Sequence, residues 1–198
     1  YDALSPGNHD FNYGYARLLE LEGKMTFPVL GANVQLKSNN TNNFKQKYIV
    51  KEIDGIKVGI FGLSTPETAT KTNPLNVEGL EFQAPETVAA EMVTELRDNQ
   101  KCDVVIALVH LGLDEATVVS ERSTAVAAVD GIDLVVDGHS HTKLENGKTD
   151  HTGAPIVQAY QYGQSIGEVK MTVAADKKVT IDSMKLHNST NTNSPEYG

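Results

Sequence analysis

The feature that most constrains the fold is an uninterrupted apolar run, VVIALV, at residues 104–109. A strand with one face in water alternates apolar and polar residues, so a continuous run predicts a strand that is covered on both faces. A second short run, LVV at residues 134–136, follows the same pattern. Segments with helical spacing lie ahead of the first run, at residues 84–100, and between the two runs, at residues 120–132. This alternation predicts an α/β layer architecture.

The regions before and after this core read as β-rich. Residues 27–36, FPVLGANVQL, are predicted to form a buried strand, and Asp54-Gly55 is predicted to be the turn of a hairpin. Beyond residue 153, the stretches PIVQAY, GEVKMTV and KKVTIDSMKL predict an antiparallel β finish. Residues 188–198 are polar and are expected to be a linker or tail, which leaves residues 1–187 for one domain.

Composition narrows the class of protein. A chain of 198 residues is long enough for one sizeable domain, and its net charge of −9 argues against a nucleic-acid polymer as a partner. Cys102 is the only cysteine, so no internal disulfide and no cysteine metal site is expected. The sequence has no window of 18 apolar residues, so no transmembrane segment is predicted. It opens without a Met, and we expect it to be a piece of a longer chain.

Amide and imidazole side chains stand where predicted strands end. The stretch SPGNHDFNYG carries Asn8 and His9, His110 ends the first apolar run, and His139 and His141 follow the second. The carboxyl ends of strands in an open α/β sheet form one rim, so we expect these side chains to lie together. On an extended segment residues two apart point to the same side, so His139 and His141 could both face one metal ion.

Each of these residues has a simpler interpretation when taken singly. A lone His110 at a strand end is more often a structural residue, and Asn8 is normally a turn residue. A His-x-His pair is as compatible with a structural role as with a metal. His151 and His187 lie in polar surroundings, where a structural role is the simpler interpretation. What favours a functional site is the combination of the three motifs.

Taken in order, Gly-Asn-His-Asp (residues 7–10), Val-His-Leu-Gly (109–112) and Gly-His-Ser-His (138–141) resemble the motifs of calcineurin-like metallophosphoesterases. More narrowly, the chain resembles the 5′-nucleotidase family, which includes UDP-sugar hydrolases and 2′,3′-cyclic-nucleotide phosphodiesterases. FPVLGANV, KVGIFGLSTPET and TNP are also similar to stretches of that family. The resemblance covers residues 1 to about 185 and implies the C-terminal part of a four-layer α/β/β/α sandwich.

The resemblance implies a metal-binding role for four residues. Asn8, His110 and His139 would bind one divalent ion, and His141 would bind a second. The ions would be Zn, Mn, Mg or Ca, and together they would support two-metal hydrolysis of a phosphoester.

The resemblance also implies a catalytic role for His9, which would donate a hydrogen bond to the phosphoryl group as negative charge develops. Gly7 is expected to allow a sharp backbone turn ahead of it. Many 5′-nucleotidases have an Asp where this chain has Asn12, and this residue orients the catalytic His. An amide can accept a hydrogen bond from imidazole but adds no charge. The stretch NHDFNYG is closer to the cyclic-nucleotide branch, so the branch stays open.

Two motifs of the family pattern are not present in these 198 residues. The family usually begins with an Asp-x-His motif and then a Gly-Asp motif whose Asp bridges the two ions. All four candidate ligands in this chain are neutral, and two close cations without an anionic bridge would repel each other. We therefore expect this chain to be a partial catalytic domain that is inactive by itself. A nucleoside-binding domain is expected downstream of Gly198.

For the parent protein the sequence predicts metal-dependent hydrolysis of nucleotide phosphoesters. The resemblance implies an extracellular, cell-surface or periplasmic location. One alternative is the 2′,3′-cyclic-nucleotide phosphodiesterase and 3′-nucleotidase branch, and another is a non-catalytic surface module derived from a metallophosphoesterase. A His-x-His amidohydrolase is disfavoured, because that barrel would place His-x-His on its first strand with about 200 residues to follow.

Overall fold

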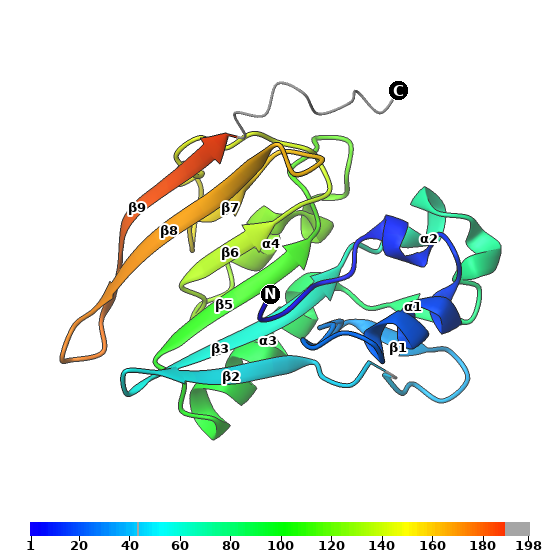
Figure 1. Ribbon diagram of the computed structural model, residues 1–198, viewed down its shortest axis with the longest axis horizontal. Helices are drawn as coiled ribbons and strands as arrows, with labels where there is room; N and C mark the ends of the chain where they lie inside the picture. The colour runs from blue at the N-terminus through cyan, green and yellow to red at the C-terminus, as the bar shows by residue number, and fades with distance from the viewer. Residues whose placement is uncertain (43, 189–198) are drawn as a thin grey trace.

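The computed structural model describes residues 1–42 and 44–188. At its centre is a five-stranded sheet of order β2-β3-β5-β6-β7 (Figure 1). Its strands are β2 (Tyr48–Ile53), β3 (Ile56–Ser64), β5 (Val104–His110), β6 (Leu134–Asp137) and β7 (Ile156–Gln158). Strands β3, β5, β6 and β7 are parallel, and β2 pairs with β3 in the antiparallel direction. The predicted α/β fold class is confirmed.

The remaining elements surround this sheet. Two small antiparallel sheets are formed by β1 (Val34–Leu36) with β4 (Leu80–Phe82), and by β8 (Ser165–Val173) with β9 (Val179–Asn188). The α-helices are α1 (Tyr15–Glu22), α2 (Thr68–Lys71), α3 (Pro85–Thr94) and α4 (Ser123–Ala127). Short 3-10 turns form η1 (Asn8–Phe11), η2 (Pro74–Asn76) and η4 (Val119–Glu121), and η3 (Glu95–Asn99) is a π-helical extension of α3.

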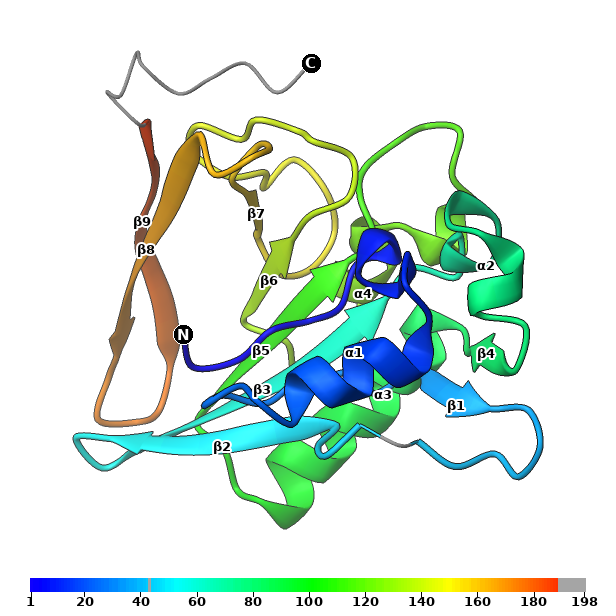
Figure 2. The same cartoon turned by 45° about the vertical axis from the view of Figure 1, so that its right-hand side comes forward.

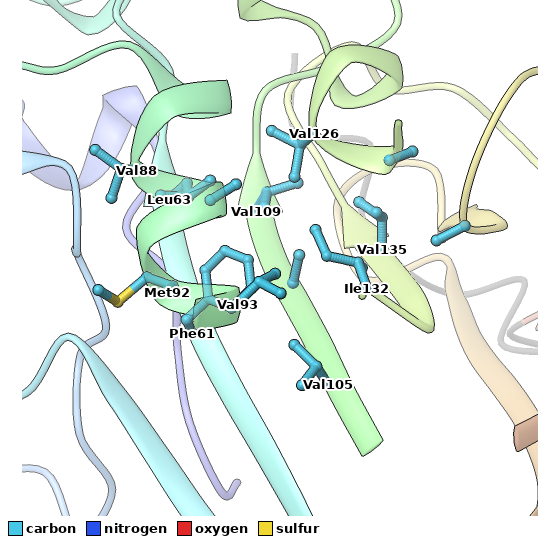
Figure 3. Packing of buried hydrophobic residues seen from close by; sticks show 14 of the residues in the cluster. Phe61, Leu63, Val88, Met92, Val93, Val105, Val109, Val126, Ile132 and Val135 are labelled. Carbon is cyan, nitrogen blue, oxygen red and sulfur yellow. The ribbon is translucent and has the colours of Figure 1, made fainter. Parts of the chain in front are cut away.

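The main core lies between the sheet and helices α3 and α4 (Figure 3). Buried residues of α3 recur at helical spacing, with Val88, Met92 and Val93 on the side that faces the sheet. They pack in the same cluster as Phe61 of β3 and Val105 of β5. Burial of this apolar surface holds the helical layer on one face of the sheet.

Strand β5 shows how far the sequence predicts the layers. Val105, Ala107 and Val109 are buried under the helices, whereas Ile106 and Leu108 point to the other face and are only half-buried. The predicted strand is therefore confirmed, but its cover on both faces is only partial in this chain. The reason is that α3 and α4 both lie on the same face (Figure 2).

The predicted hairpin is confirmed. Ile53 pairs with Ile56, and the two turn residues have φ angles of 51° (Asp54) and 78° (Gly55). Positive φ at both central residues matches the right-handed twist of the strands, which is why Asp-Gly is favoured at this turn.

Two of the other strand predictions need correction. Residues 27–36 do not form one strand, since residues 29 and 30 make isolated bridges and only β1 is regular. A Cβ at Gly31 would lie 2.6 Å from the ring of Phe44, so the ring packs directly against the backbone of this segment. The sequence predicts an antiparallel strand at PIVQAY, but β7 is parallel to β6. Residues 138–155 carry the chain back to the other end of the sheet before β7 begins. The antiparallel finish is confirmed only for β8 and β9.

The N-terminal segment is tied to the end of β3. Ser5 Oγ donates to the carbonyl of Leu63 (3.0 Å), and Ser64 Oγ donates to the carbonyl of Pro6 (2.8 Å). A second apolar cluster, centred on Phe11 and Leu18, holds η1 and α1 against the β1–β4 sheet. Together these contacts fix η1 beside the ends of β3 and β5 (Figure 2).

The predicted tail at residues 188–198 lies outside the described residues, apart from Asn188, which is the last residue of β9. Across residues 1–42 and 44–188, none of the helices has the length and apolar character needed to cross a bilayer.

Candidate functional site

The predicted histidines gather at the rim formed by the carboxyl ends of the parallel strands. His110 is the last residue of β5, and His139 and His141 come two and four residues after β6 ends at Asp137. The three residues are placed at the rim, as the sequence predicts, because β5 and β6 are neighbouring parallel strands.

Asn8 and His9 reach the same rim by another route. They lie in η1, and the segment before η1 is not a regular strand but makes an isolated bridge from Leu4 to Val29. The expectation that every motif follows a strand is therefore wrong for Asn8. The turn itself is closed by Asp10, whose carboxylate accepts a hydrogen bond from the backbone N–H of Gly7 (2.7 Å).

Asn8, His110 and His139 form what we call the inner cluster. Asn8 Oδ1 lies 3.2 Å from His110 Nε2 and 3.2 Å from His139 Nδ1, and the two ring centroids are 5.1 Å apart. Asn8 Nδ2 donates to the carbonyl of Lys71 (3.2 Å), which turns the amide oxygen toward the rings. Asn8 is 4% exposed, so this amide is held inside the protein.

Two motif glycines make room for the ring of His110. A Cβ at Gly7 would lie 2.7 Å from His110 Cε1, and a Cβ at Gly138 would lie 3.0 Å from His110 Nδ1. Gly7 has a φ of −87°, which any residue can adopt. The turn that begins at Gly7 therefore does not need the conformational freedom of glycine, which corrects the expectation, and the missing side chain instead leaves space for the ring.

Glu67, which the sequence analysis did not single out, completes the surroundings of His139. Its Oε2 lies 2.9 Å from His139 Nε2 and accepts a hydrogen bond from Thr117 Oγ1 (3.2 Å). Burial acts to raise the pKa of Glu67, but the hydrogen bond to His139 and the charge of Lys71 outweigh it and hold the pKa below its usual range. Glu67 is thus a carboxylate placed to accept a hydrogen bond from Nε2–H of His139.

The inner cluster brings hydrogen-bond acceptors close together. With its proton on Nε2, a neutral His139 turns the lone pair of Nδ1 toward Asn8 Oδ1, which is also an acceptor. Burial and the neighbouring His139 lower the pKa of His110 to about 4, so its ring is neutral near pH 7. A metal ion between these atoms would satisfy the contact, and two imidazole nitrogens with an amide oxygen are acceptable ligands for one divalent ion.

The cluster depends on an amide ligand. Within the described part of the chain, no three His, Cys, Asp or Glu side chains are grouped so that they could hold a metal. The set of three is reached only when Asn8 is counted. The residues present therefore fit one ion.

Asp137 links the segment after His110 to the segment before His139 through buried hydrogen bonds. Its Oδ1 accepts hydrogen bonds from the backbone N–H groups of Leu111 and Gly112 (3.1 Å each), and its Oδ2 accepts from Gln158 Nε2 (3.0 Å) and Ser123 Oγ. Burial raises the pKa of Asp137, although the hydrogen bonds from Ser123 and from the backbone of Gly112 and Leu111 oppose the shift. The carboxylate fixes the segment after His110 to the segment before His139.

His141 lies outside the inner cluster. It is exposed, and its ring packs against that of Tyr162 with centroids 5.6 Å apart. The φ angles are 79° at His139 and 51° at His141, so this segment is not extended and the two side chains do not share a side for that reason. His141 is still close enough that its charge contributes to lowering the pKa of His110.

His9 is exposed at the same rim and contacts Asn12, as expected. Asn12 Nδ2 lies 3.1 Å and Oδ1 3.4 Å from His9 Nδ1. Oδ1 also accepts a hydrogen bond from the hydroxyl of Thr72 (2.8 Å). With Nδ1 engaged by Asn12, Nε2 is the ring nitrogen left for a ligand.

Comparison with known proteins bears on what this rim does. A profile for the calcineurin-like phosphoesterases matches residues 2–143, a range that includes every candidate residue named above. This chain belongs to the calcineurin-like phosphoesterase family. The resemblance inferred from the three motifs is thereby confirmed.

Individual proteins that are similar to the chain include nucleotide phosphoesterases. The chain is 31% identical to the protein UshA of Yersinia enterocolitica over 94% of the chain and 36% of the relative. It is 29% identical to the trifunctional nucleotide phosphoesterase protein YfkN of Bacillus subtilis over 93% of the chain and 14% of the relative. The structure of a 5′-nucleotidase precursor from Thermus thermophilus superposes with a TM-score of 0.76 at 26% identity, over 95% of the chain and 39% of that protein. The phosphoesterase chain thus spans well under half the length of each of these relatives.

Proposed function

We propose that the protein containing this phosphoesterase chain hydrolyses nucleotide phosphoesters with the help of divalent metal ions. The observation that carries the proposal is the inner cluster, where His110 Nε2 and His139 Nδ1 both face Asn8 Oδ1 at 3.2 Å. The substrate class is supported by the relatives, which are a trifunctional nucleotide phosphoesterase and a 5′-nucleotidase precursor.

In this proposal Asn8, His110 and His139 hold one ion, and His141 contributes to a second. A bound ion supplies Lewis acidity and lowers the pKa of water that it coordinates. The imidazole ligands favour an ion such as zinc over magnesium or calcium. The chain's own part is to fix the ligands, with Asp137 joining the segments of His110 and His139 and Glu67 holding Nε2 of His139.

His9 is proposed to act on the substrate rather than on a metal. It is exposed beside the inner cluster, and its Nδ1 is engaged by Asn12. Nε2 would then donate a hydrogen bond to a phosphoryl oxygen, where negative charge grows as the bond to the leaving group breaks.

The isolated chain is proposed to be inactive and to hold at most one ion weakly. Asn8 is uncharged, and the three histidine ligands carry no charge when their rings are neutral. A pair of close divalent cations needs an anionic bridge. The remaining ligands and a nucleoside-binding domain are proposed to come from the rest of a longer protein, consistent with the greater length of the relatives. An extracellular, cell-surface or periplasmic location is likewise a proposal.

The test is phosphate release from 5′-nucleotides by the full-length protein, with and without a chelator. We expect His139→Asn to deplete metal and activity together. His9→Asn should lower kcat by about 10²–10³-fold and leave the metal content unchanged. Loss of metal in His9→Asn, or full metal content in His139→Asn, would contradict the assigned roles.

A second candidate function is that of the 2′,3′-cyclic-nucleotide branch. It is favoured by Asn12, because many 5′-nucleotidases have an Asp at this position. Comparing 2′,3′-cyclic AMP with AMP as substrates separates the two. Hydrolysis of neither substrate by the metal-loaded, full-length protein would favour the non-catalytic alternative.

A further inference from the structure

The segment that follows β3 holds η1 and the next residue, Asn12, through three hydrogen bonds. Besides Asn8 Nδ2, which donates to the carbonyl of Lys71 (3.2 Å), Thr72 Oγ1 donates to Asn12 Oδ1 (2.8 Å). Asn76 Nδ2 donates to the backbone carbonyl of Asn12 (2.6 Å). Both the backbone and the side chain of Asn12 are therefore held by residues 60 and 64 positions further along the chain.

The contact with Thr72 sets which end of the Asn12 amide meets His9. An Asn side chain has one accepting end and one donating end. With Oδ1 occupied by the hydroxyl of Thr72, the donating Nδ2 is the closer atom to His9 Nδ1, at 3.1 Å against 3.4 Å for Oδ1. An N–H group that points at Nδ1 requires a lone pair there, so the proton of the neutral ring is on Nε2.

We propose that Thr72 is a positioning residue that acts through Asn12 to hold neutral His9 as its Nε2–H tautomer. The inference rests on the proposed function, in which His9 Nε2 donates to the phosphoryl group. A carboxylate at position 12 would instead accept from Nδ1–H, and a neutral ring would then have no proton on Nε2. The amide lets a neutral His9 donate from the nitrogen that faces the ligand.

The burial of Thr72 supports this role. Thr72 is 9% exposed, so its hydroxyl has little access to water and gains from a protein acceptor. Asn12 is exposed and would otherwise rotate its amide freely. The buried hydroxyl is therefore the fixed end of the pair, and the exposed amide follows it.

The tautomer can be read directly by two-bond ¹H–¹⁵N correlation spectra of the full-length, metal-free protein with ¹⁵N-labelled histidine. Spectra are recorded at about pH 8.5, where an ordinary imidazole is neutral. The signal of His9 is assigned by its loss in His9→Asn. We expect a protonated Nε2 and an unprotonated Nδ1 in the unmodified protein.

Three variants test the chain of contacts. Thr72→Val removes the hydroxyl at nearly constant volume and should give a mixture of tautomers. Thr72→Ser keeps the hydroxyl and should restore the Nε2–H form. Asn12→Asp should reverse the pattern and place the proton on Nδ1.

In the activity assay, Thr72→Val should lower kcat by about 10–100-fold, the usual cost of removing a partner that orients a functional His, and Thr72→Ser should recover it. KM should stay within about twofold, because Thr72 is buried and acts through Asn12.

A proton on Nδ1 in the unmodified protein, or an unchanged His9 spectrum in Thr72→Val, would overturn the proposal. Should Thr72→Val fail to fold, the unmodified protein and Asn12→Asp still decide the matter. The spectra need no substrate, so a protein that hydrolyses no nucleotide but shows the Nε2–H form would refute the proposed function and leave the role of Thr72 standing.

Discussion

The inner cluster and the exposed residues of the rim differ in what holds them. Asn8 is held by the carbonyl of Lys71, and His139 by the carboxylate of Glu67. His141, in contrast, is exposed and packs against the exposed ring of Tyr162. Asn8 and His139 are therefore held in place by other protein groups before any cation binds, whereas His141 is exposed and is less constrained. This difference predicts that substitutions of the buried residues in and around the inner cluster have large effects on stability or metal affinity. Substitution of the exposed His141 should have a small effect on stability.

The largest effect is expected from Asp137→Ala. The change removes the acceptor of four buried donors and should lower the free energy of unfolding by roughly 3–5 kcal/mol. Urea unfolding followed by circular dichroism measures this. The control is Asp130→Ala at an exposed position, where we expect a change within about 0.5 kcal/mol. Equal stabilities of the two variants would mean that Asp137 does not join the histidine segments.

The next effect is a pH dependence that His110 confers. Its pKa of about 4 in the folded chain lies below the ordinary value of 6.5, so the unfolded chain takes up a proton first as the pH falls. Metal-free protein should lose about 3 kcal/mol of stability from this residue as the pH falls from 6.5 to 4. His110→Gln should remove that part of the slope, whereas His187→Gln, at an exposed position, should leave it unchanged. An identical slope in His110→Gln would show that His110 is not buried as a neutral ring.

A smaller effect is expected from Glu67→Gln in the full-length protein. The amide can no longer hold the Nε2 proton of His139 as a charged acceptor, so zinc affinity should fall by about 10–100-fold. Isothermal titration calorimetry measures the affinity. Glu121→Gln is a matched control, because Glu121 is close enough to interact electrostatically with Glu67, whereas the carboxylate that pairs with His139 is that of Glu67. Equal losses in both variants would point to general charge rather than to the hydrogen bond.

The smallest effect is expected from His141→Ala. The side chain is exposed and its ring contacts Tyr162, so the free energy of unfolding should change by no more than about 0.5 kcal/mol. Thermal unfolding of metal-free protein measures this. A loss above about 1 kcal/mol would place His141 with the residues of the inner cluster and remove the contrast between the two regions.

The sequence predicts the features that depend on neighbouring residues, and it does not predict those that depend on residues far apart along the chain. Strand β5, strand β6 and the turn at Asp54 depend on local patterns and are predicted correctly. The position of His110 at the rim follows from those strands. The left-handed backbone of His139 has no such pattern, and neither has the parallel direction of β7.

The roles of Glu67 and Asp137 are hidden in the sequence because their partners lie far away along the chain. Glu67 meets His139 72 positions later, and Asp137 meets Gly112 25 positions earlier. A carboxylate at the end of an apolar run is the available signal for Asp137. For Glu67 the only signal is that STPET lies in a stretch that resembles the family. Single side chains at such distances can be paired only after the sheet order is known.

The contacts of Asn8 also have a consequence for the order of folding. They join residues 102 and 131 positions apart, so they close the two longest loops among the hydrogen-bond contacts described above. The entropy of closing such loops is recovered only when the sheet between them already exists, whereas the β2–β3 hairpin closes within a few residues. We therefore expect the hairpin to form early and the inner cluster to be among the last parts of the domain to assemble. During synthesis Asn8 leaves the ribosome before His110 and His139, so its amide oxygen can contact both rings only after His139 has been made.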